Sequence, residues 1–282
     1  MTTIFLTAVS MIAFAGNSLL CRLALKSGSI DPASFTTLRL VSGAVTLAVI
    51  VRARSAGSRA KGDWPSALAL FMYAASFSYA YVGLPTGVGA LLLFGAVQVT
   101  MIGFGLMRGE RLRAAQSWGL AAACGGLVAL LMPGAHAPDL RASLLMVVAG
   151  AAWGAYTLRG RLAGPALQVT AGNFLRAAAF GLILSAGLWS RAQLTGPGIG
   201  FAVMSGAVTS GIGYAIWYTV LPRIRATQAS AVQLTVPVIA ALGAVALLGE
   251  SLTWRLAWTS IVVLGGVGLV IGTAARRRID EP

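Results

Sequence analysis

Aromatic and amide residues recur at helical spacing inside the hydrophobic segments of this chain. Tyr73, Phe77 and Tyr81, for example, follow the i, i+4, i+8 spacing that places side chains on one face of a helix. Rings can stack on an apolar solute, and amides can hydrogen-bond to its polar groups. We predict that the following residues line a binding cavity: Asn17, Tyr73, Phe77, Tyr81, Phe94, Gln98, Trp153, Tyr156, Tyr214, Trp217, Tyr218 and Gln233.

These residue types also have a structural interpretation, which the sequence leaves open for any single residue. Tyr and Trp form belts at membrane interfaces, and Asn or Gln bridge packed helices. Two arginines pose the same choice, because Arg39 and Arg176 lie within hydrophobic segments, 137 residues apart. Each guanidinium either hydrogen-bonds to neighbouring helices and snorkels, or contacts a carboxylate or phosphate of a bound anion.

The residues needed for most catalytic and metal chemistry are missing. The chain has one histidine, His136, and two cysteines, Cys21 and Cys124, which lie inside hydrophobic segments. The sequence also lacks the HExxH, GxSxG and GxxxxGK[ST] motifs. We therefore expect no enzyme, no ATP-driven pump, no metal site and no cofactor.

The acidic residues all fall at segment ends or in connections rather than at mid-membrane. Proton-coupled transport usually needs a titratable group at depth, so we expect movement without a carboxylate relay. Glu110 and Glu250 are predicted to be structural, capping helix ends or pairing with arginine. The acidic residues are Asp31, Asp63, Glu110, Asp139, Glu250, Asp280 and Glu281.

Ten hydrophobic segments must position these side chains. Each is about 18 to 25 residues long, enough to cross a hydrocarbon core of about 30 Å. The chain is 57% hydrophobic and only 10% charged, too apolar for an ordinary soluble domain. We predict an all-α integral membrane protein with ten transmembrane helices, near 3–26, 33–52, 64–82, 86–107, 114–132, 141–160, 168–189, 197–221, 227–248 and 253–274.

The two halves of the chain repeat each other at an offset of 140 residues. We therefore predict two five-helix repeats, 1–137 and 138–282. An odd number of crossings per repeat makes the copies inverted, as in many secondary transporters. Pro237, whose counterpart is Val97, is expected to act as a hinge in the ninth segment. The seven repeated identities are Gly103/Gly243, Gly109/Gly249, Glu110/Glu250, Leu112/Leu252, Trp118/Trp258, Gly125/Gly265 and Gly126/Gly266.

The net charge of +14 is distributed in a way that indicates a membrane orientation rather than nucleic-acid binding. With a cytoplasmic N-terminus, fourteen of the 21 Lys and Arg residues fall in cytoplasmic segments and five in outer ones. This asymmetry follows the positive-inside rule, so both termini are predicted to be cytoplasmic. The expected partner surface is therefore the lipid bilayer, and no nucleic acid is expected.

Three motifs resemble those of the drug/metabolite transporter superfamily, and within it the ten-helix EamA-type carriers. They are Gly109-Glu110-Arg111-Leu112 with its repeat Gly249-Glu250-Ser251-Leu252, the Trp153-Gly154 pair, and Pro237 followed by an apolar run to Gly249. The chain as a whole is most similar to the aromatic amino acid exporters of this family. The resemblance implies a bacterial-type inner-membrane carrier that exports aromatic and other neutral amino acids.

One departure limits what the resemblance implies. Small multidrug carriers of the superfamily have a first-helix Glu, where this chain has Asn17, so their proton-for-cation antiport is not implied. Three alternatives stay open: a carrier of phosphorylated or nucleotide sugars that uses Arg39 and Arg176, an integral-membrane enzyme, and a structural subunit. The sequence also leaves open whether the working unit is a monomer or a homodimer.

Overall fold

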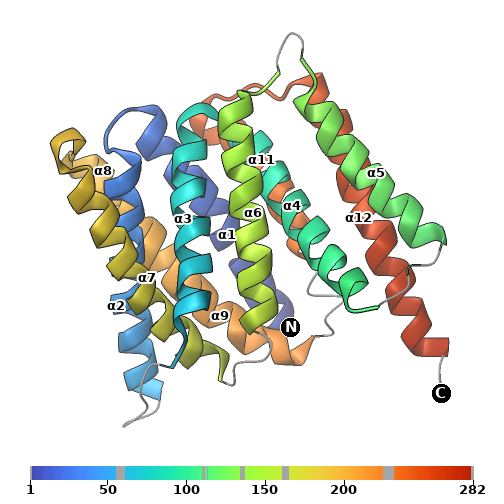
Figure 1. Cartoon of the computed structure of the whole chain (residues 1–282), viewed down its shortest axis with the longest axis horizontal. Coiled ribbons are helices and arrows are strands. Elements are labelled where there is room, and N and C mark those ends of the chain that lie inside the picture. Colours follow the sequence, from blue (N-terminus) through green and yellow to red (C-terminus); the bar gives the residue numbers. More distant parts are fainter. Residues whose placement is uncertain are drawn as a thin grey trace.

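The computed structural model describes residues 2–54, 61–109, 112, 114–133, 137–160, 165–224 and 232–280, which form a helical bundle (Figure 1). Nine helical segments in this part are long and apolar enough to cross a membrane. The predicted all-α fold class is confirmed. The first seven helices are α1 (Thr2–Lys26), α2 (Pro32–Arg54), α3 (Trp64–Gly83), α4 (Thr86–Met107), α5 (Ala114–Leu131), α6 (Leu140–Gly160) and α7 (Ala166–Gly187).

The rest of the chain is less regular. The last long helix continues to Asp280, six residues beyond the predicted end of the tenth segment. Glu110 and His136, singled out in the sequence, lie outside the described residues. The remaining elements are η1 (Trp189–Arg191), α8 (Gly196–Met204), η2 (Ser205–Ile212), α9 (Gly213–Val220), η3 (Leu221–Arg223), α11 (Thr235–Leu248) and α12 (Trp254–Asp280).

Three aspartates begin helices, which explains why the acids lie at segment ends. Asp31 accepts hydrogen bonds from the backbone N–H groups of Ala33 and Ser34 at the start of α2. Asp63 caps α3, and Asp139 caps α6. A carboxylate at these positions satisfies N–H groups that have no partner within the helix and interacts favourably with the helix dipole.

The sequence predicts a single helix for the eighth hydrophobic segment, but the structure does not show one regular α-helix there. Between α8 and α9 it forms a π-helix, η2, from Ser205 to Ile212. Its Gly206 packs against α2 so closely that an added Cβ would lie 2.2 Å from the carbonyl oxygen of Arg39. Such π-helical turns are frequent at functional sites. This one brings Ser205, Thr209 and Ser210 to the centre of the bundle.

The ninth segment also differs from its prediction, because α11 begins at Thr235 and a turn at Leu234 interrupts the helix. Pro237 therefore lies in the first turn of α11 rather than inside a continuous helix. Proline has no N–H to donate to the carbonyl four residues earlier, here that of Gln233, and its ring crowds that carbonyl. The same residue that was predicted to be a hinge thus accounts for the break.

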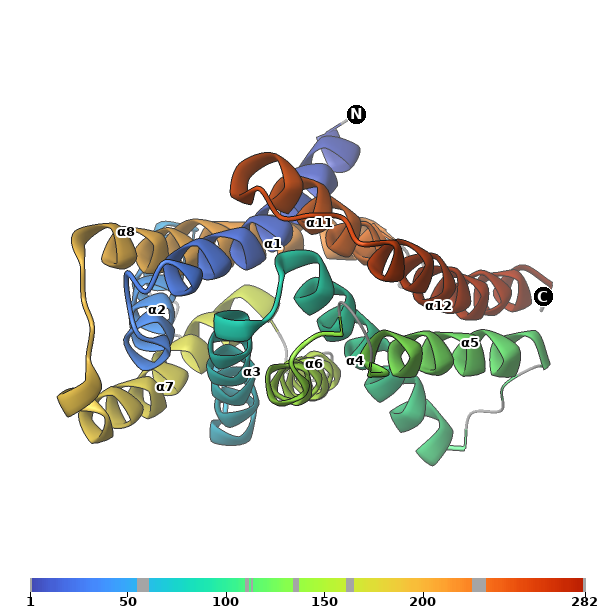
Figure 2. The same ribbon diagram turned by 90° about the horizontal axis from the view of Figure 1, so that it is seen from above.

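The contacts between helices are repeated in the two halves of the chain: a contact between two helices recurs between the helices five segments away from them. The pairs α2 with α7, α5 with α12 and α4 with α11 map onto themselves. The contact of α3 with α6 corresponds to that of the eighth segment with α1, and the contact of α4 with α6 to that of α11 with α1. Seen from above, α5 and α12 extend together to one side of the bundle (Figure 2). This arrangement is what a duplicated five-helix unit would produce.

Candidate functional site

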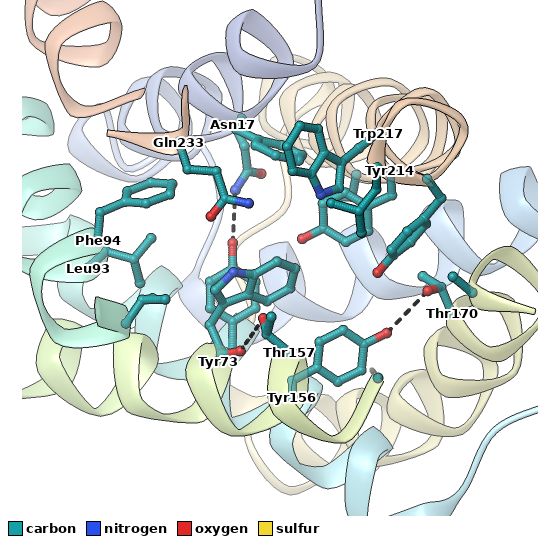
Figure 3. Close-up of a pocket in the computed structure, with 18 of the residues that line it drawn as sticks. Asn17, Tyr73, Leu93, Phe94, Tyr156, Thr157, Thr170, Tyr214, Trp217 and Gln233 are labelled. Atoms are coloured by element: carbon teal, nitrogen blue, oxygen red, sulfur yellow. Dashed lines mark hydrogen bonds between the residues drawn. The ribbon is translucent and has the colours of Figure 1, made fainter. Parts of the chain in front are cut away.

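The bundle encloses a chamber of about 310 Å³ between α1, α3, α4, α6, α7, η2 and α9 (Figure 3). This volume is at the lower end of the range of small-molecule sites, so it suits one small solute. All the predicted lining residues except Tyr81 border it. They are Asn17, Tyr73, Phe77, Phe94, Gln98, Trp153, Tyr156, Tyr214, Trp217, Tyr218 and Gln233.

Trp153 on α6 is the centre of an aromatic wall. Its ring centroid lies 4.8 Å from that of Tyr73 on α3 and 5.4 Å from those of Tyr156 and Tyr214. Phe14 on α1 joins the wall edge-on to Tyr214, at 5.6 Å. Such tilted and edge-to-face contacts are favourable beyond the apolar area that they bury, and they hold the rings in place. The chamber therefore presents fixed aromatic surface to a solute.

Asn17 on α1 is the hub of a buried polar network at the chamber. Its Oδ1 accepts hydrogen bonds from the hydroxyls of Ser205 (2.6 Å) and Thr209 (3.4 Å) on η2. These two donors fix the orientation of the amide, so its Nδ2 faces the other way and donates to the Tyr73 hydroxyl at 3.4 Å (Figure 3). The network connects α1, α3 and η2 across the wall of the chamber.

Arg39 on α2 lies directly behind this wall and is only 1% exposed. Its Nη2 donates to the Tyr73 hydroxyl at 3.0 Å, and its Nε donates to the Ser210 hydroxyl at 3.4 Å. Its guanidinium also lies over the rings of Tyr73 and Phe77, 5.1 and 5.0 Å from their centroids. A buried guanidinium is well suited to such contacts because it is planar and weakly hydrated.

Two other predicted site residues lie away from the chamber. Tyr81 is fully buried above it, where its hydroxyl donates to the carbonyl of Thr86 at 3.3 Å and its ring packs edge-on against Phe77. Arg176 donates to the carbonyl of Gly172 within its own helix and lies 5.9 Å from the centroid of Trp64. Of the two arginines, Arg39 therefore reaches residues of the chamber wall, whereas Arg176 has the contacts of a structural side chain.

Several lining residues carry no sequence signal of their own. Thr157, Thr170, Thr209 and Ser210 contribute hydroxyls to the chamber. Small hydroxyl residues commonly pack between transmembrane helices, so their type alone did not distinguish them. Thr170 accepts a hydrogen bond from the Tyr156 hydroxyl at 3.5 Å, a pairing that the sequence separation of fourteen residues could not predict.

The lining of the chamber reaches one end of the bundle. Its lining includes Gly160 and Ala166, at the end of α6 and the start of α7. Beyond the opposite end, Arg22 pairs with Glu250 at 3.2 Å, and Glu250 also accepts from the backbone N–H of Thr86 at 2.7 Å. The structural role predicted for Glu250 is thereby confirmed, since it both pairs with arginine and meets the start of α4.

Fixed carboxylates lie outside the chamber in the part of the chain that the structure describes. At the capping position of α3, partial burial tends to raise the pKa of Asp63, but hydrogen bonds from Ser66 and the nearby Arg159 guanidinium outweigh it and hold the pKa below its usual value. Asp63 is therefore ionised at physiological pH, and its carboxylate is bound by Ser66 and Arg159. Among the described residues, no group of three or more His, Cys, Asp or Glu side chains could hold a metal.

Comparison with known proteins decides the family. Residues 140–272 match the model of the EamA-like transporter family. An uncharacterised protein of Pseudomonas aeruginosa is 54% identical over 279 residues, covering 97% of both chains. The chain belongs to the EamA-like transporter family. The protein is accordingly a multi-pass membrane transporter.

A solved crystal structure of another protein shares the fold of this EamA-like transporter. It superposes with a TM-score of 0.64 over 93% of this chain and 98% of that chain, at 21% sequence identity. At this level of identity the likeness concerns the fold alone. The match nevertheless extends over both halves of the chain, whereas the family model covers the second half.

Proposed function

We propose that this transporter exports amino acids, aromatic and other neutral ones, by alternating access through the chamber, without a carboxylate proton relay. The observation that carries the proposal is the composition of the chamber wall: rings, amides and hydroxyls, with no carboxylate among the described lining residues. Such a wall suits a zwitterion with a sizeable apolar side chain. The rings supply contact area, and the polar groups meet the ammonium and carboxylate.

The direction of access fits export. On the positive-inside orientation, the connection between α6 and α7 faces the cytoplasm, so the chamber is accessible from the side on which an exporter loads. The ion pair of Arg22 with Glu250 then closes the outer side. We propose a bacterial-type inner membrane with both termini cytoplasmic, and a reporter fused to Pro282 on the outer side would contradict this orientation.

Alternating access requires a second state in which the two ends exchange roles. We propose that residues 1–137 and 138–282 form oppositely oriented repeats, so that the same contacts can be made and broken at either end. The exchange of packing partners between helices five segments apart supports this division. Binding need only be weak, of order mM, because a carrier must release what it binds.

The alternative within the family is a carrier of phosphorylated or nucleotide sugars. That function would use both Arg39 and Arg176 as anion contacts. Because Arg176 bonds within its own helix, only Arg39 adjoins the chamber, and a single indirect guanidinium is a poor match for a dianionic phosphate. Amino acid transport is therefore the better-supported proposal.

Counterflow into liposomes that contain the purified protein tests the proposal. Vesicles are loaded in turn with tryptophan, threonine and a sugar phosphate, and uptake of the labelled form of each is followed, with protein-free vesicles as the control. We expect tryptophan exchange, weaker threonine exchange and no sugar phosphate exchange. Exchange of the sugar phosphate alone would support the alternative instead, and exchange of none of the three would contradict both.

A further inference from the structure

The Tyr73 hydroxyl has a proton that the described part of the protein does not bind. Its oxygen accepts from Arg39 Nη2 at 3.0 Å and from Asn17 Nδ2 at 3.4 Å. A hydroxyl has two acceptor positions and one proton to donate. With both acceptor positions used, Tyr73 can act toward a third group only as a donor. Because Tyr73 lines the chamber, that group is a molecule inside it.

The charge behind Tyr73 is also unbalanced. In the described part of the chain, the carboxylates that form ion pairs are Glu250 with Arg22 and Asp63 with Arg159, and neither contacts Arg39. Arg39 Nη1 is buried and has no hydrogen-bond partner there. A buried cation without a counter-charge is costly, and the cost is relieved when an anion comes close. The two hydroxyls that Arg39 contacts, those of Tyr73 and Ser210, belong to residues that line the chamber.

We propose that the chamber recognises its solute through a carboxylate, which accepts the Tyr73 proton and balances the charge of Arg39. Arg39 acts here as a positioning residue, since it reaches the solute through the Tyr73 hydroxyl. The inference rests on the proposed function and names the group through which the solute is recognised, a carboxylate on an apolar body. This class contains the amino acids and also carboxylates without an ammonium group, because the described chamber wall has no fixed negative charge that would require one.

Four ligands that share one indole ring test this recognition. Purified wild-type protein is titrated with tryptophan, indole-3-propionate, tryptamine and tryptophan methyl ester, and binding is followed by ligand-observed NMR. Tryptophan and indole-3-propionate should bind with similar affinity. The two ligands without a carboxylate should bind at least about tenfold more weakly, because they lose a hydrogen bond to a charged group. Tryptamine binding as tightly as tryptophan would overturn the inference.

The outcomes separate this inference from the proposed function. A protein that exchanges tryptophan in vesicles but binds tryptamine equally well keeps its function and loses carboxylate recognition. Binding of indole-3-propionate without any tryptophan exchange would keep carboxylate recognition and contradict amino acid export. If neither carboxylate binds, the inference is overturned.

Two tyrosine variants test whether the Tyr73 hydroxyl is the group that binds the carboxylate. Tyr73→Phe removes the hydroxyl and keeps the ring beside Trp153. It should weaken tryptophan binding about tenfold and methyl ester binding much less, because the neutral ester carbonyl is a weaker acceptor than a carboxylate, so the preference for the carboxylate disappears. The matched control is Tyr156→Phe, the same change on the same chamber, where the lost hydroxyl donates to Thr170. In the control both ligands should weaken equally. Equal weakening in Tyr73→Phe would overturn the assignment.

The role of Arg39 needs a variant that keeps the buried charge. Arg39→Lys retains the cation but loses the fork that reaches both Tyr73 and Ser210. In protein whose thermal unfolding shows that it is folded, the ratio of tryptophan to methyl ester affinity should fall severalfold. A merely structural arginine would change stability and leave that ratio as it is in the wild type, and this result would remove Arg39 from the proposal.

Discussion

Helices α5 and α12 pack along each other at the edge of the bundle (Figure 2). The chamber lies elsewhere, between α1, α3, α4, α6, α7, η2 and α9. In the first region the two helices approach closely: a Cβ on Gly119 would lie 2.6 Å from the carbonyl oxygen of Gly266, and one on Gly126 would lie 2.7 Å from a side-chain methyl of Val263. Small residues permit this approach, which replaces hydrophobic driving force inside a membrane.

The repeated sequence is used differently in the two regions. Gly126 and Gly266, one of the repeated pairs, both lie in the α5–α12 contact. In the chamber, by contrast, Gln98 has Val238 at the offset of 140, and Gln233 has Leu93. Packing is thus symmetric where the helices meet, while the recognition chemistry is not. Internal repeats locate the scaffold, and departures from the repeat locate the site.

The largest expected effect is on the scaffold. Gly119→Val places a branched side chain against the backbone of α12, and such overpacking costs about 1–3 kcal/mol or more. Thermal unfolding in detergent should show a clear loss of stability. Gly125→Val is the matched control on the same helix, because a Cβ there has no atom within 4 Å. Equal unfolding temperatures for the two variants would break the comparison.

A second pair of variants separates recognition from packing. Trp153→Ala removes the centre of the aromatic wall and should reduce tryptophan exchange in vesicles about tenfold or more, since three ring contacts are lost. Trp118→Ala makes the same change on α5, where the side chain is 74% exposed on the outer face of the bundle. Its exchange rate should equal that of the wild type. Similar losses in both would mean that Trp153 supports the fold rather than the solute.

The two ion pairs of the described chain should differ in a third test. Arg22 and Glu250 are 11% and 10% exposed, so Glu250→Gln removes the counter-charge of a largely buried arginine. Arg22 keeps its hydrogen bonds to the carbonyls of Tyr81 and Val82, so the protein should lose about 1.5 kcal/mol. Arg159 and Asp63 are 48% and 41% exposed, and Asp63→Asn should cost less than about 1 kcal/mol. Chemical denaturation measures both, and a reversed order would contradict the burial of the first pair.

The smallest effect concerns pH. Partial burial tends to raise the pKa of Asp31, but hydrogen bonds from Ser34, Gln193 and Ala33 outweigh it and lower the pKa below its usual value. A lowered folded pKa means that its contribution is present at neutral pH and lost as pH falls through that pKa, below about pH 4. Asp31→Asn should flatten the decline of the unfolding temperature between neutral and acidic pH. An unchanged decline would show that other carboxylates account for it.

Much of the fold follows from local sequence, and the exceptions have physical causes. The limits of the hydrophobic runs lie close to the observed helix limits. Asp63 directly precedes α3, and Gly249 directly follows α11. The turn at Leu234 was not predicted, because hydropathy does not register the N–H that Pro237 lacks. The π-helix η2 brings Gly206 into close contact with α2, a tertiary contact that no local pattern contains.

The sequence predicted which aromatic residues line the chamber, but not how far the chamber extends along α3. Helical spacing groups Tyr73, Phe77 and Tyr81 on one face, yet eight residues advance a helix by about 12 Å. Tyr81 therefore lies beyond the chamber, beside the start of α4. The link from Arg39 through Tyr73 joins residues 34 positions apart on different helices. This contact arises from the packing of α2 against α3 and η2, which the sequence does not reveal.

The central claim is that a chamber of rings and amides, without a buried acid, moves a neutral solute with no proton relay. Tryptophan flux into proteoliposomes, measured with and without an imposed pH gradient while internal pH is recorded, tests it most directly. We predict that tryptophan equilibrates to the same final level in both cases and that internal pH does not follow the flux. Accumulation of tryptophan against its gradient when the pH gradient is imposed, with protons moving in fixed ratio to it, would contradict the account.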